Sequence, residues 1–104
     1  MTRRDLHLAG STTLERDDMT VRVAEALSQI DAVLVDFSVF ANLSTLMRME
    51  LPARQVGTLG HRLRASGLTL DEKSESALRG YDPAGQVTAT LRITFGRTAL
   101  AAAG

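Results

Sequence analysis

The order in which strand-like and helix-like patterns follow one another constrains this chain more than any other feature. A strand half-buried in a sheet places apolar residues at every second position, and an amphipathic helix places them three or four positions apart. Leu6 and Leu8 show the first spacing, and Val23 and Leu27 show the second. Six segments of these two kinds predict the order β-α-β-β-α-β: strands at Asp5–Gly10, Ala32–Phe40, Ser44–Leu51 and Leu68–Glu72, and helices at Asp18–Ile30 and Pro52–Ser66.

This order is the split βαβ, or ferredoxin-like, arrangement. It predicts an α+β sandwich in which an antiparallel sheet carries both helices on one face. The region between Lys73 and Gln86 is polar, and its Asp82-Pro83-Ala84-Gly85 sequence predicts a turn. A further strand is predicted at Val87–Phe95, in addition to the four strands of the ferredoxin-like arrangement. We expect this additional C-terminal strand to extend an edge of its own sheet or to pair with another subunit.

Local signals predict the surroundings and the ends of these elements. The continuous apolar run Ala32–Val35 is typical of a central strand that is covered on both faces. Asp17 and Asp18 favour the start of the first helix as N-cap residues, and Pro52 suits the first turn of the second helix. Asn42 tolerates the left-handed conformation that a hairpin turn requires. We therefore expect a hairpin between the second and third strands and a capped helix on either side of it.

Length and composition indicate one soluble domain. The 104 residues are enough for a single core, and we expect one domain over residues 1–97, with the additional strand at 87–95 and a flexible tail at 98–104. The 12 basic and 12 acidic residues cancel, which argues against nucleic acid or an anionic membrane as a partner. No stretch approaches the length of a membrane span, and there is no cysteine. We therefore expect a cytoplasmic protein.

No motif in the sequence indicates catalysis or metal binding. Neither His7 nor His61 has a histidine partner three or four positions away, as a metal-binding helix would provide. The loop after the first strand is acidic, so it would repel the acyl phosphate that an acylphosphatase binds. The first strand also lacks the aromatic residues on which RNA-recognition modules stack bases. We therefore predict no enzymatic activity, no cofactor and no metal site.

Three segments resemble the ACT domain, a small regulatory module, and more narrowly the N-terminal ACT region of some bacterial phosphoserine phosphatases. Leu14–Leu27 is similar to the loop, Asp-x-Pro-Gly in the family, that opens the first helix. Val39–Pro52 is similar to the long hairpin with its Leu-Pro exit, and Leu91–Ala99 to a strand that ends in Gly-Arg. ACT domains bind amino acids or other small ligands and commonly pair. The resemblance implies an ACT-like domain that binds a free amino acid, serine-like by analogy, and acts as a homodimer.

The resemblance also implies a ligand site. It would lie between Thr12–Met19 of one subunit and Val39–Leu43 of the other. The ligand-binding residues that it implies are Thr13, Glu15, Asp17, Asp18, Phe40 and Asn42. Helix capping is the alternative role for the three carboxylates of this set.

Two functions remain open at this point. The first is the regulatory, amino-acid-binding module that the resemblance implies. The second is a ligand-free dimerisation or protein-interaction module. Asp17 and Asp18 favour the second, because they replace the family's Pro-Gly and would repel the carboxylate of a bound amino acid. A homodimer is expected in both cases, since an exposed strand as long as Val87–Phe95 favours pairing.

Overall fold

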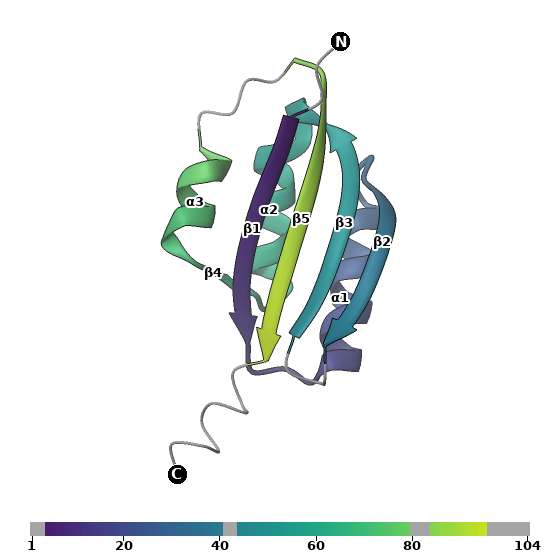
Figure 1. Ribbon diagram of the computed structural model, residues 1–104, viewed down its shortest axis with the longest axis vertical. Helices are drawn as coiled ribbons and strands as arrows, with labels where there is room; N and C mark the ends of the chain where they lie inside the picture. The colour runs from purple at the N-terminus through teal and green to yellow at the C-terminus, as the bar shows by residue number, and fades with distance from the viewer. Residues whose placement is uncertain (1–3, 41–43, 80–83, 96–104) are drawn as a thin grey trace.

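The computed structural model describes residues 4–40, 44–79 and 84–95, which form a five-stranded sheet and three α-helices (Figure 1). The elements in chain order are β1 (Arg4–Thr12), α1 (Arg16–Ser28), β2 (Val33–Phe40), β3 (Ser44–Pro52), a 3-10 turn (Ala53–Gln55), α2 (Val56–Ala65), β4 (Thr69–Leu70), α3 (Glu72–Leu78) and β5 (Gln86–Phe95). The predicted α+β class is confirmed.

The sheet is mixed, with the strand order β2-β3-β5-β1-β4. β1 runs parallel to β5, and every other neighbouring pair is antiparallel. The prediction of an antiparallel sheet is therefore wrong in this respect. A sheet that carries α1 and α2 on the same face is nevertheless compatible with a ferredoxin-like fold (Figure 1). We call the face that carries these two helices the helix face, and the opposite face the open face.

β5 occupies the centre of the sheet, between β1 and β3. The prediction that Val87–Phe95 extends a sheet edge or pairs with another subunit is therefore wrong. Every second residue of β5 is apolar and buried: Val87, Ala89, Leu91, Ile93 and Phe95. A strand with an unbroken apolar face is stabilised most where helices cover that face and neighbouring strands pair with both of its edges. The central position meets both conditions.

β4 and α3 together close the sheet edge beside β1. β4 pairs with β1 only at Gly10 and Ser11, and α3 continues the coverage. The Ser74 hydroxyl accepts a hydrogen bond from the Ala9 N–H (2.7 Å) and donates one to the Ala9 carbonyl (3.2 Å). The Asp71 N–H also donates to that carbonyl (2.9 Å). The first turn of α3 and its N-cap residue therefore form the hydrogen bonds to β1 that a longer edge strand would otherwise form.

α3 lies in a region that the sequence predicts as strand and polar turn. The strand predicted at Leu68–Glu72 is shortened to β4, because Asp71 accepts a hydrogen bond from the Ser74 N–H (2.8 Å) and caps a helix there. Only Ser74 and Leu78 of α3 are buried, so the helix carries no apolar stripe that the sequence pattern would reveal. The second predicted helix also starts later than expected, since Pro52 ends β3 and precedes the 3-10 turn.

β2 ends the sheet on the side away from β4. The prediction that Ala32–Val35 belongs to a central strand covered on both faces is therefore wrong for the single chain. The exposed fractions of Val33, Leu34 and Val35 are 63%, 44% and 52%. The apolar residues of β1, β3 and β5 instead form the core with α1 and α2. The apolar run of β2 is thus left on the surface of the molecule.

Candidate functional site

The outer edge of β2 is the most apolar exposed surface of the described residues. Seven large hydrophobic side chains of the described residues are exposed. Only one of them, Val21 on α1, lies outside β2. The other six belong to β2: Val33, Leu34, Val35, Phe37, Val39 and Phe40. Their exposed fractions run from 39% to 63%. These side chains lie on both faces of one edge strand, and apolar side chains that gather on one element, unlike ones scattered singly, indicate an interaction site.

The pairing of β2 with β3 shows which side chains share a face. Phe37 and Val39 lie opposite Met47 and Thr45, which are buried, so these two β2 residues point to the helix face. Asp36, Ser38 and Phe40 alternate with them and point to the open face. A β-bulge interrupts the ladder between Leu34 and Asp36. The regular part of the strand is therefore Asp36–Phe40.

The two edges of the sheet differ in how their backbone is protected. Natural edge strands avoid pairing by being short, by carrying lysine or proline, or by being covered. β4 has two residues, and α3 covers the rest of that edge. β2 has eight residues, with neither lysine nor proline, and Asp36 is its only charged residue. The β2 edge therefore has little protection against another strand.

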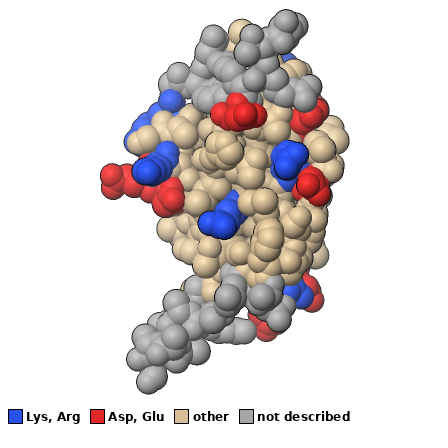
Figure 2. Space-filling model, in the orientation of Figure 1, with Lys and Arg blue, Asp and Glu red and all other residues tan. Residues whose placement is uncertain are grey.

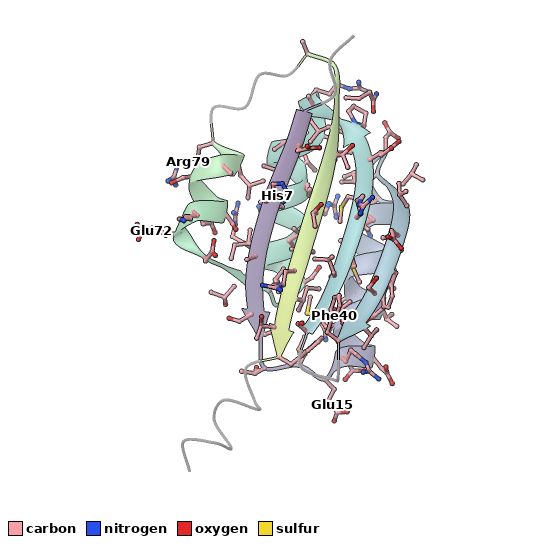
Figure 3. The ribbon with its side chains drawn as sticks, in the orientation of Figure 1. His7, Glu15, Phe40, Glu72 and Arg79 are labelled. Carbon is pink, nitrogen blue, oxygen red and sulfur yellow. The ribbon has the colours of Figure 1, made fainter. Side chains whose placement is uncertain are left out.

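The implied ligand-binding residues lie at one end of the molecule. Figure 3 shows Glu15, which precedes α1, at the same end as Phe40, the last residue of β2. Thr13 is exposed in the loop between β1 and α1, and Asp17 and Asp18 are exposed in the first turn of α1. Asn42 lies outside the described residues. The structure thus brings the β1–α1 loop and the end of β2 to one end within a single chain.

The acidic residues of this end do not cap α1 as predicted. Glu15 holds the N-cap position without a side-chain cap hydrogen bond, and Asp17 and Asp18 follow inside the helix. The prediction that these aspartates are the N-cap is therefore wrong by two or three positions. They still lie where carboxylates interact favourably with the helix dipole. Asp17 also lies 3.9 Å from the Arg16 side chain.

Three cavities on the described surface are lined by residues other than the implied ligand-binding set. The largest of the three, about 330 Å³, is on the open face and is lined by residues that include His7, Thr90, Arg92 and Lys73. The other two hold about 200 and 250 Å³ and lie between α1 and α2 and beside β4. Figure 2 shows basic and acidic side chains distributed over the open face, without a patch of one sign. None of these three cavities is lined by the implied ligand-binding residues.

Asp71 has a pKa that its local hydrogen bonds lower. Hydrogen bonds from the Ser74 side chain and backbone hold the pKa of Asp71 below its usual range, with a smaller contribution from Lys73. This shift is explained by the role of Asp71 as the N-cap of α3.

No group of three histidine or acidic side chains in this part of the chain is arranged to hold a metal ion. No helix in the described ranges has the length and apolarity to cross a membrane.

Comparisons with protein families, curated proteins and solved structures found no match to this chain. The resemblance to ACT domains and the cytoplasmic location therefore stay predictions.

The sequence analysis did not predict that β2 is an edge strand. Its signal was present in the apolar run Ala32–Val35, but periodicity alone does not tell whether such a strand is covered by its own chain or by a partner.

Proposed function

We propose that this chain is a non-catalytic interaction domain that forms a homodimer through the outer edge of β2. The observation that carries the proposal is the set of six exposed apolar side chains on this one strand. Pairing with a second strand removes apolar surface from water and supplies backbone partners along the edge, where the Phe37 N–H donates to the Asp36 carboxylate (2.8 Å) in the single chain. Addition of a strand to an exposed sheet edge is a common mode of protein recognition.

The sequence pattern of β2 supports a strand as the binding partner. The run Ala32–Val35 has the composition of a strand that is covered on both faces, yet Val33, Leu34 and Val35 are exposed in the single chain. A second copy placed against β2 covers part of this exposed apolar surface. The homodimer expected from the sequence is therefore retained as a proposal, but with β2 in place of Val87–Phe95.

The unequal edges favour a closed dimer over a filament. Each copy offers one open edge at β2, because β4 and α3 close the other edge. An interface in which both copies use the same surface consumes the open edge of each copy. Association therefore stops at two chains.

A charge placed in the β2 edge tests the proposal. Val39→Lys puts a lysine at a half-exposed position of β2, and Val21→Lys puts the same charge at a comparably exposed position of α1. We expect wild type and Val21→Lys to sediment as dimers and Val39→Lys as a monomer, because burying an unpaired ammonium in the interface is costly. Far-UV circular dichroism checks that both variants are folded. A monomeric wild type, or a Val39→Lys dimer as stable as wild type, contradicts the proposal.

A second candidate is a regulatory ACT-like domain that binds a free amino acid. The observation that favours it is the shared location of the β1–α1 loop and the end of β2 at one end of the chain (Figure 3). A ligand at about 100 times its dissociation constant stabilises the folded state by about 2.7 kcal/mol. In a domain of this size that raises the unfolding temperature by roughly 10 °C or more. A selective rise with one amino acid in a thermal-unfolding panel supports this candidate, and a flat panel rules it out.

A further inference from the structure

The β-bulge in β2 limits how two copies of this strand can pair. A bulge disrupts the ladder locally and bends the strand, so a regular partner strand pairs only beside it. The ladder with β3 is regular over Asp36–Phe40 and shifts between Leu34 and Asp36. Residues 41–43 beyond this segment lie outside the described ranges. The longest regular segment available for self-pairing is therefore five residues long, from Asp36 to Phe40.

Two-fold symmetry restricts the register further. In an antiparallel ladder, directly opposite residues point to the same face. When the two strands are identical and related by a two-fold axis, residue i of one copy faces residue j of the other and the reverse. Residues on the same face of the regular segment differ by an even number. One residue of each copy must therefore lie directly opposite the same residue of the other copy, with the axis midway between the two. We name each register by this residue.

Among these registers, one uses the whole regular segment. An axis at its middle residue, Ser38, pairs all five positions of Asp36–Phe40. An axis at Phe37 or Val39 leaves only three of these positions paired within the segment. An axis at Asp36 places two carboxylates opposite each other, which is destabilising.

We infer that two copies of this chain pair antiparallel along β2 with the two-fold axis at Ser38. This inference rests on the proposed function and specifies its geometry. On the helix face, Phe37 of each copy lies opposite the partner's Val39, so two apolar pairs extend the core under both helix layers. On the open face, Asp36 lies opposite the partner's Phe40 and away from the partner's carboxylate. The result is a continuous ten-stranded sheet with four long helices on one face.

This register has a consequence for ligand binding. Because the two β2 strands run in opposite directions, the end of β2 in one copy lies beside the start of β2 in the other. The β1–α1 loop of one copy and the end of β2 in the other then lie at opposite ends of the interface. A ligand site shared between these two segments, as the ACT resemblance implies, does not form in this dimer. Any site built from them lies within one chain.

Disulfide cross-linking tests the register directly, because the chain has no cysteine of its own. Directly opposite residues of an antiparallel pair have Cα atoms about 4.5 or 5.5 Å apart, within the range of about 4.4–6.8 Å that a disulfide spans. Ser38→Cys therefore places two thiols opposite each other at the axis. Ser11→Cys is the matched control, since Ser11 is exposed on β1 and far from β2 in the strand order. We expect oxidised glutathione to convert Ser38→Cys to a covalent dimer at least ten times faster than Ser11→Cys.

A second pair of variants reports the neighbouring register position. Asp36→Cys and Phe40→Cys should form a disulfide when the two variants are mixed. Each should cross-link poorly alone, because like positions lie four residues apart along the ladder, about 13 Å. Cross-linking of Asp36→Cys with itself overturns the register, as does a Ser38→Cys rate equal to that of Ser11→Cys. If the wild type sediments as a dimer in that case, the proposed function stands and only the register fails. A monomeric wild type removes the proposed function itself.

Discussion

Thr45 is a buried residue whose hydroxyl has no hydrogen-bond partner. It lies on β3 opposite Val39 and Ile93, its exposed fraction is 0%, and its Oγ1 is the one buried side-chain oxygen or nitrogen of the described residues without a partner. A buried polar group without a partner loses its hydrogen bonds to water on folding and regains none. The residue is tolerated because threonine suits a strand and its methyl group packs in the core.

Replacing this hydroxyl by a methyl group should stabilise the protein. We expect Thr45→Val to raise the free energy of unfolding by about 1 kcal/mol, because the penalty for the unpaired hydroxyl disappears. The midpoint of urea unfolding measures the change. Thr12→Val is the matched control, since the Thr12 hydroxyl is also buried but accepts a hydrogen bond from the Leu14 N–H (3.1 Å). We expect that variant to be destabilised, and a Thr45→Val midpoint at or below wild type would contradict the account.

Asp71 should make stability depend on pH in the acid range. Hydrogen bonds from Ser74 lower its pKa in the folded state below the ordinary value of 3.8. The contribution to stability is therefore fully present above that value and is lost as the pH falls through the lower, folded-state pKa. We expect Asp71→Asn to weaken the decline of the urea midpoint below roughly pH 5, the range in which carboxyl groups titrate. An NMR titration that gives Asp71 an ordinary or raised pKa would disprove this assignment.

At the scale of elements, the two glycines of α2 differ in their surroundings. A Cβ at Gly57 would meet no atom within 4 Å, whereas a Cβ at Gly60 would lie 2.7 Å from a Leu78 methyl carbon of α3. Both positions lose backbone entropy on folding, but only Gly60 allows close packing of a neighbouring helix. Close packing against α3 therefore explains Gly60 and not Gly57.

Alanine substitutions separate these two roles. We expect Gly57→Ala to raise the free energy of unfolding by about 0.5–1 kcal/mol, because alanine has the higher helix propensity and meets no clash. Gly60→Ala gains the same propensity but must displace Leu78, so its stability should be lower than that of Gly57→Ala. Chemical denaturation of both variants gives the comparison. Equal gains in stability would show that Leu78 of α3 shifts to accommodate the new methyl group without any loss of stability.

Elements with a strong apolar pattern were predicted well, and those without one were not. β1, α1, β2, β3 and α2 all form close to their predicted ranges, since each has an apolar periodicity of its own. α3 was missed because only two of its residues, Ser74 and Leu78, are buried, so it has no apolar periodicity. Its place depends on hydrogen bonds to Ala9, which is 65 residues away from Ser74 in sequence. Such a contact is invisible to a local pattern.

At the scale of the whole molecule, dimerisation should couple stability to concentration. A homodimer that unfolds to monomers has an unfolding temperature that rises with protein concentration, because mass action favours the associated state. We expect this rise for wild type and for Val21→Lys across a hundredfold range of concentration, and a constant unfolding temperature for Val39→Lys. Differential scanning calorimetry measures it. A concentration-independent wild type would argue that the chain folds and functions as a monomer.

The amino-acid sequence by itself determined the α+β class, the alternation of most strands and helices, and which residues of each strand are apolar. These follow from local periodicity, which records how a segment divides its side chains between core and solvent. Only the tertiary structure decided that Val87–Phe95 is the central strand and that Val33–Phe40 is an edge. Strand order depends on which long-range pairings bury the most apolar surface together, and no single segment contains that information. The surface proposed for dimerisation exists because the most apolar hairpin strand was left without a second neighbour.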